Sequence, residues 1–222
     1  MITDRYSGLT KLIKQPAARL LANANAELQT EIVAPASAAV DVVLRELEQR
    51  GALVDIMRLL SVALPARERV WWSCLAGRDT LPPGAKVPQP LAAAEAWVFK
   101  PTEENRAAAH HAAQHAAMKD DTKHCAMAVQ WHDGTLGPGD LAQHPAPPGG
   151  SEVAAFAMNI VAIAKSGKLL DEAAVWSLTD NSQFEAMQHF YQEHELFRVP
   201  QVINSYNYVI DKNTKVKLGD KK

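Results

Sequence analysis

Cysteine is scarce in this sequence, which has only Cys74 and Cys125 among its 222 residues. Two such widely spaced cysteines cannot form the disulfide framework of a small secreted domain. Aromatic residues make up only 6% of the chain, and the hydrophobic fraction of 47% is carried mostly by alanine, leucine and valine. Because alanine and leucine favour helices and glycine is also scarce, the composition predicts an all-α fold.

The chain also lacks an excess of charge of one sign. Lysine and arginine number 23 against 25 acidic residues, which gives a formal net charge of −2. No strong field therefore draws it to nucleic acid or to an anionic membrane, and we expect neither as a partner. The N-terminus contains no uninterrupted apolar run typical of a secretory signal, so we expect a cytoplasmic protein.

The longest apolar stretch covers residues 153–164 and is interrupted by Asn159. It is well short of the roughly 20 apolar residues that a membrane-spanning helix needs. The stretch therefore predicts a buried core helix and no membrane insertion.

Apolar residues recur at helical spacing through most of the chain. They predict helices over residues 40–47 and 53–64, ended by Gly51 and Pro65. Together the patterns predict a bundle of about eight helices. The further helical segments are residues 66–78, 91–100, about 103–119, 122–131, a helix around Phe156, residues 173–178, and a stripe of Phe184, Met187, Tyr191 and His194.

We expect residues 1–204 to form one helical domain, with a possible subdivision at the proline-rich loop 79–90. Residues 205–222 are predicted to form a tail. The tail alternates weakly and could make a short hairpin about Lys212 and Asn213, but its lysine content favours a solvated, frayed end.

Histidines gather in residues 107–125, which contain four of the eight in the chain. His111 and His115 are four residues apart, so a helix would place both on one face, a spacing found in zinc sites. The pattern lacks the glutamate of HExxH, and Glu104 would lie about 10 Å away along the helix axis. A solvated helix face is the favoured interpretation. A third ligand would have to come from His124, Cys125 or His132.

The sequence also lacks recognisable catalytic motifs. It contains no GxSxG, neither cysteine lies in a motif that would lower its pKa, and Cys74 is expected to act as a small buried hydrophobe. The glycines of GTLGPGD are not followed by a Walker lysine, and Pro138 removes an amide donor. We therefore predict no enzyme and no catalytic, cofactor-binding or metal-ligating residue. The charges of Lys100, Glu103, Glu104 and Arg106 are explained by helix capping and i, i+3 pairing.

Trp71 and Trp72 are adjacent, so on a helix their side chains point about 100° apart. They cannot fill the same space. We expect one of them in the core and the other at its boundary.

Three blocks of sequence resemble a bacterial family of unknown function. They are VWWSCLAGR, AAEAWVFKPTEENRAAA and CAMAVQWHDGTLGPGDL, and the similar region covers residues 53–165. Members of the family look like companions of contractile type VI secretion gene clusters, near spike-tip and adaptor proteins. The resemblance implies no catalytic residue, and the histidine run is not part of its pattern. The residues that match the pattern are Trp71, Trp72, Cys74, Trp97, Pro101, Asn105, Arg106, Trp131 and Gly134.

These observations predict a non-enzymatic module that binds other proteins, an adaptor or chaperone for type VI secretion cargo whose partner is a secretion effector or spike component. The loops 82–90 and 145–150 and the tail after Asn204 are candidate contact elements. One alternative is an immunity-type inhibitor of a toxic effector. The other is a metal-dependent enzyme built on His111 and His115. The sequence leaves the oligomeric state open.

Overall fold

The computed structural model describes Tyr6 and residues 11–165. This part contains eight α-helices and one 3-10 helix, with two isolated antiparallel bridges and no strands, so the predicted all-α fold is confirmed. The predicted helices at 173–178 and 184–194, the hairpin and the tail lie outside the described residues. The elements are α1 (Ala17–Asn23), α2 (Val40–Gln49), α3 (Leu53–Ala63), α4 (Ala66–Asp79), α5 (Gln89–Phe99), α6 (Glu103–Gln114), α7 (Lys123–Gln130), η1 (Gly139–Gln143) and α8 (Gly150–Lys165).

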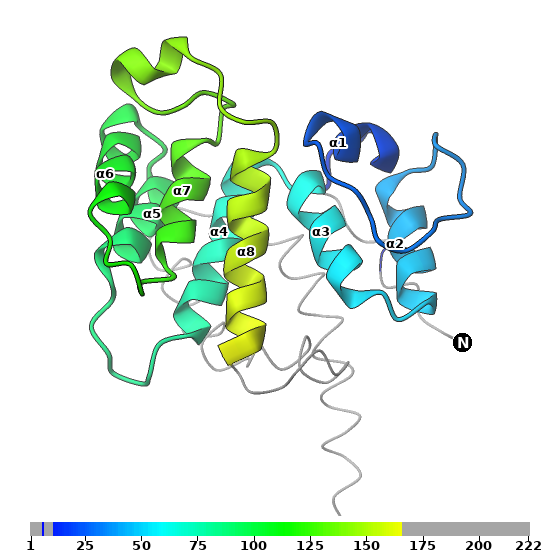
Figure 1. Cartoon of the computed structure of the whole chain (residues 1–222), viewed down its shortest axis with the longest axis horizontal. Helices are drawn as coiled ribbons and strands as arrows, with labels where there is room; N and C mark the ends of the chain where they lie inside the picture. The colour runs from blue at the N-terminus through cyan, green and yellow to red at the C-terminus, as the bar shows by residue number, and fades with distance from the viewer. Residues whose placement is uncertain (1–5, 7–10, 166–222) are drawn as a thin grey trace, which may run out of the picture.

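The helices form two groups that meet along α8 (Figure 1). Helices α4, α5, α6 and α7 pack against one another on one side, and α1, α2 and α3 lie on the other. Helix α8 contacts α4, α7 and α3, so it joins the two groups. The long connection that contains η1 lies at one end of the bundle, next to the start of α8.

Local signals fix several helix ends. Gly51 adopts a positive φ of 66° directly after α2, a conformation that glycine accepts without steric cost. Helix α3 ends where Leu64 becomes extended before Pro65, as proline disfavours helical geometry in the preceding residue. The predictions for these two helices are confirmed.

Helix α6 is shorter than predicted. It ends at Gln114 rather than near residue 119, and His115 is its C-cap residue. The ring Nδ1 of His115 lies 2.9 Å from the carbonyl oxygen of His111. Helix α1, with only seven residues, was not predicted.

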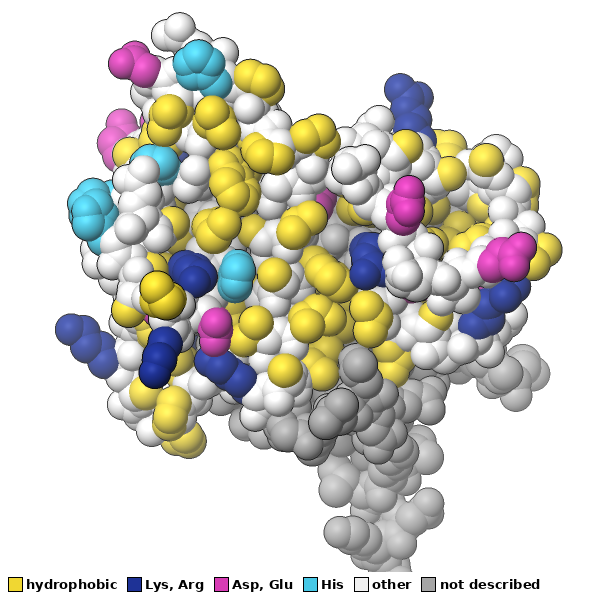
Figure 2. All heavy atoms as spheres, in the orientation of Figure 1, with side chains coloured by type: hydrophobic (Ala, Val, Ile, Leu, Met, Phe, Trp, Pro, Cys, Tyr) yellow, Lys and Arg dark blue, Asp and Glu magenta, His cyan; other side chains and the backbone are white. Residues whose placement is uncertain are grey.

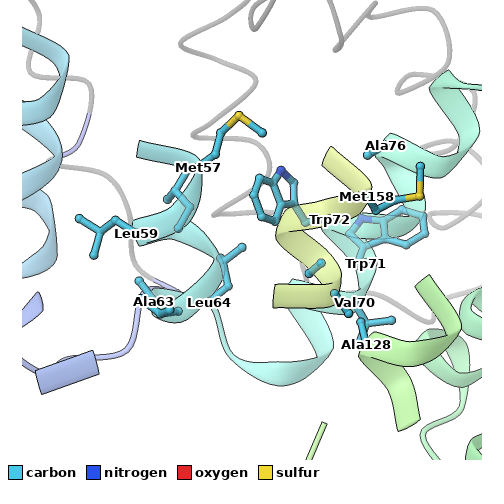
Figure 3. Close-up of a cluster of buried hydrophobic side chains, with 14 of the residues drawn as sticks. Met57, Leu59, Ala63, Leu64, Val70, Trp71, Trp72, Ala76, Ala128 and Met158 are labelled. Atoms are coloured by element: carbon cyan, nitrogen blue, oxygen red, sulfur yellow. The ribbon is translucent and has the colours of Figure 1, made fainter. Parts of the chain in front are cut away.

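The tryptophan pair is buried more completely than expected. Trp71 is 5% exposed and Trp72 is 8% exposed, so the prediction that one lies at the core boundary is wrong. Figure 3 shows the Trp72 ring on the side of Met57 of α3 and the Trp71 ring beside Met158 of α8. Because α4 has helices on both sides, its two adjacent tryptophans fill different parts of one core.

Candidate functional site

Arg106 is the largest fully buried side chain of the described residues, with 1% exposure. Its guanidinium donates to both carboxylate oxygens of Asp133, each at 2.7 Å. It also donates to the Gln130 carbonyl at 2.8 Å and to the Thr135 hydroxyl at 2.7 Å. This cation is therefore fully partnered, and it fixes the chain that follows α7 onto α6.

Asp133 is held as a carboxylate. Burial alone would raise its pKa, but hydrogen bonds from the amide and hydroxyl of Thr135 and the charge of Arg106 lower that pKa below its ordinary value. The Thr135 amide lies 3.0 Å and the hydroxyl 2.8 Å from Oδ1 of Asp133. We refer to Arg106, Asp133 and Thr135 as the Arg106 cluster.

The block FKPTEENR, residues 99–106, builds a corner between α5 and α6. Asn105 Nδ2 donates to two carbonyl oxygens at the end of α5, and Arg67 donates to two more. Thr102 caps α6, as predicted, by accepting from the Asn105 amide at 3.4 Å. These polar groups therefore satisfy helix ends. The four acceptors are the carbonyl oxygens of Ala96, Lys100, Val98 and Phe99.

Arg69 is a second buried cation, which the sequence analysis missed. Its guanidinium donates to the carbonyl of Ser61 at 2.8 Å and to that of Leu64 at 3.0 Å. It also bonds to Ser151 Oγ at 3.2 Å and lies 2.8 Å from Glu152. Burial lowers the pKa of Arg69, and the charge of Glu152 partly opposes this shift. Arg69 thereby ties the start of α8 to the α3–α4 connection.

The histidine pair on α6 makes a stack. The rings of His111 and His115 are nearly parallel, with centroids 4.0 Å apart. His124 and His132 are half-buried, and burial lowers the pKa of each. In the part of the chain that the structure describes, no three His, Cys, Asp or Glu side chains converge as a metal site. The candidate third ligands are thus not brought to the pair.

Both cysteines are buried and free. Cys125 Sγ lies 3.2 Å from the Ser73 carbonyl, which places α7 directly against α4. Burial, together with the neighbouring Cys125 thiol, raises the pKa of Cys74 well above its ordinary value. The prediction that Cys74 is a small buried hydrophobe is confirmed.

Helix α8 has apolar side chains around its whole circumference between residues 153 and 164, apart from Asn159. Asn159 is buried and donates to the carbonyl of Ala155 at 2.9 Å. The predicted core helix is confirmed for one side only, because Val153 is 58% exposed. No helix among residues 11–165 meets the length and apolarity required for a bilayer crossing.

We call the outward side of this helix the α8 outer face. In Figure 2 hydrophobic side chains gather over α8 and its neighbours at the centre of the view. The rim of the α8 outer face carries charges of both signs. The Arg58 Cζ atom lies 5.1 Å from the centroid of the Phe156 ring, and Lys165 Nζ lies 2.8 Å from Asp121 Oδ2. The α8 outer face consists of Val153, Phe156, Ala157, Ile160, Val161 and Ala164.

Two carboxylates fasten the extended segment between α1 and α2. Asp55 accepts from the amides of Gln29 at 3.1 Å and Thr30 at 2.8 Å. Glu46 accepts from the next amides along, those of Val33 at 2.7 Å and Ala34 at 2.9 Å. The Val33 amide is the main cause that lowers the pKa of Glu46. A separate open groove of about 430 Å³ is lined by residues 12–16, by the start of α2 and by Tyr6.

Residues 43–179 match a family of unknown function, DUF6931. The chain belongs to this family. The match covers more than half of the chain and supports the resemblance to a domain of unknown function. No curated protein and no solved structure matches this member of DUF6931.

The match divides the described features into two sets. The Arg106 cluster, Arg69 and the α8 outer face lie inside the region matched to DUF6931, whereas α1 and the groove precede it. Asp55 and Glu46 lie inside the match but bind amides outside it. The family region thus contains the buried cations and the apolar face, and it anchors the preceding segment.

Proposed function

We propose that this DUF6931 protein is a non-enzymatic binding module whose α8 outer face docks a helix of another protein. The observation that carries the proposal is the apolar outer side of α8, on which Val153 is exposed and Ile160 is half-buried. An amphipathic helix binds such a surface by burying its own apolar stripe against it. The half-buried side chains Phe156, Ile160 and Val161 pack on the core from below, so the surface is held in place before a partner arrives.

The charges at the rim favour a protein partner over a lipid surface. Arg58 and Lys165 are each paired with an acidic residue, Asp55 and Asp121 respectively. Surfaces that lie on membranes carry unpaired lysine and arginine beside the apolar face. A protein interface instead combines an apolar centre with a polar rim of both signs.

The resemblance to companions of type VI secretion clusters supplies the biological setting of the proposal. In that setting the module is a cytoplasmic adaptor or chaperone, and its partner is an effector or a spike component. A chaperone for cargo needs an apolar docking surface rather than a reactive centre, which agrees with the character of α8.

The test is co-purification of the full chain with type VI spike and effector proteins, which the proposal expects to be encoded beside it. We expect at least one of them to be retained, and Val153→Asp to weaken retention at least tenfold. The control is Met118→Asp, which places the same charge at an apolar residue that is 91% exposed in the connection between α6 and α7. Equal retention by both variants, or no retained protein, would overturn the proposal.

A growth assay separates the adaptor from an immunity-type inhibitor. Co-expression with a neighbouring toxic effector should leave its toxicity in place if the chain is an adaptor. Full rescue of growth would instead assign the chain to the inhibitors.

A further inference from the structure

Helix α8 presents a physical conflict. A helix that is apolar all round is normally covered on every side, because exposed apolar surface costs free energy in water. Among the described residues, helices α3, α4 and α7 cover three sides of α8. Its fourth side, the α8 outer face, is left with Val153 and Ala164 exposed at its two ends.

The chain itself contains a segment with the complementary pattern. Residues 182–197 read SQFEAMQHFYQEHELF, and Phe184, Met187 and Tyr191 fall at i, i+3 and i+7. On a helix these three side chains would form one apolar stripe. The segment contains no lysine or arginine and three glutamates, which keeps its remaining surface polar.

We infer that residues 182–197 dock on the α8 outer face in the free protein, so that a partner must displace them to bind. The inference rests on the proposed function, since it assigns the same face an internal occupant. Residues 182–197 would then compete with a partner for the α8 outer face, so the partner would need a higher affinity for that face.

The lengths agree with this arrangement. At 1.5 Å per residue, the face from Val153 to Ala164 is about 16 Å long and the stripe from Phe184 to His194 about 15 Å. Residues 166–181 connect the two and can span up to about 42 Å with residues 173–178 helical, as the sequence predicts, and the other ten residues extended. The chain can therefore reverse after Lys165 and run antiparallel to α8.

An antiparallel arrangement sets the pairing of ends. Ala164 should then lie near Phe184, and Val153 should lie near His194. A parallel arrangement would exchange the two pairs.

The test places the photo-crosslinking residue benzoylphenylalanine at position 153 or 164 of the full chain, followed by digestion and mass spectrometry. Both positions are exposed, so the replacement leaves the core intact. We expect crosslinks within one molecule from position 164 to the peptide around Phe184, and from position 153 to that around His194. The control is the same residue at position 118, where Met118 is 91% exposed; it should give no crosslink to residues 182–197.

Crosslinks from 153 and 164 that join two molecules, reach other segments or are absent would overturn the inference. Phe184→Asp with Tyr191→Asp should remove the crosslinks and raise retention of a partner. If the crosslinks are absent but Val153→Asp still weakens partner retention, the inference fails and the proposed function stands. If the crosslinks form but no partner is retained, the proposed function fails and α8 is simply covered by its own chain.

Discussion

Arg106 and Val153 both lie in the region that matches the DUF6931 family, but one is a buried charge and the other an exposed apolar side chain. Arg106 is a charge taken out of water, and each side of its guanidinium meets an acceptor supplied by Gln130, Asp133 or Thr135. Val153 is an apolar side chain left in water, with 58% of its surface exposed. A partnered buried charge specifies the shape of the molecule, whereas an unpartnered apolar face is available for contact with another helix.

The largest predicted effect removes the cation. Arg106→Met should cost about 3–5 kcal/mol of unfolding free energy, because Asp133 and the Gln130 carbonyl lose their donor. Urea unfolding followed by circular dichroism measures this change. The control is Arg45→Met on α2, where the partly exposed i, i+4 pair with Asp41 should contribute less than about 1 kcal/mol. Equal losses in the two variants would contradict the assigned role of the Arg106 cluster.

The second prediction concerns the glycine before α8. Gly149 has a φ of 72°, and an added Cβ would lie 2.1 Å from the carbonyl oxygen of Ala24. Gly149→Ala should cost about 2–4 kcal/mol, since it combines left-handed strain with a backbone clash. Gly139→Ala is the matched control, with a φ of 63° and open space, and should cost about 1–2 kcal/mol. Calorimetric unfolding of both variants decides whether the clash contributes.

Acid should weaken the fold on the side of the Arg106 cluster. Burial lowers the pKa of His132 and of His124 in the folded protein. As the pH falls, these histidines are therefore protonated in the unfolded chain at a higher pH than in the folded protein. This contribution to stability is complete above the unfolded pKa of about 6.5 and is lost as the pH falls below it. The lowered pKa of Asp133 acts only at more acidic pH, near and below about 4. Melting temperatures should therefore fall between pH 7.5 and pH 5, and a flat profile would count against the half-buried histidines.

The smallest effect on stability should come from the α8 outer face. Val153→Asp should cost about 1 kcal/mol of unfolding free energy, more than the roughly 0.5 kcal/mol limit of an exposed site, because the inferred docking of residues 182–197 covers this face in the free protein. Met158→Ala, on the buried side of the same helix, should cost about 2–5 kcal/mol. Thermal unfolding of the two variants compares the sides directly. A loss within about 0.5 kcal/mol would instead mean that the face is open to water in the free protein, against the inferred docking of residues 182–197.

Sequence reasoning succeeded where the signal was local. Gly51 and Pro65 fix helix ends through their own backbone geometry, and Thr102 caps α6 through a residue three positions away. The seven-residue α1 is too short to show a periodic pattern, and nothing in the apolar spacing indicated that α6 ends at Gln114 with His115 as its C-cap residue.

The rest depends on contacts between distant segments. Nothing near Arg106 in the sequence indicates that its partner is Asp133, 27 residues away. The apolar run of α8 predicted burial correctly for Met158 and wrongly for Val153. A run that is apolar on all sides contains no information about how many sides its neighbours cover.

Because both thiols are buried, the rate of their chemical modification reports how often the helices around them open. The thiolate is the form that attacks an alkylating reagent, and the burial of Cys74 disfavours its thiolate, while Cys125 Sγ lies against the carbonyl of Ser73. Modification therefore has to wait until α4 and α7 separate. The alkylation rate of Cys74 and Cys125 would therefore measure how often α4 and α7 separate in the protein, without any label or engineered probe.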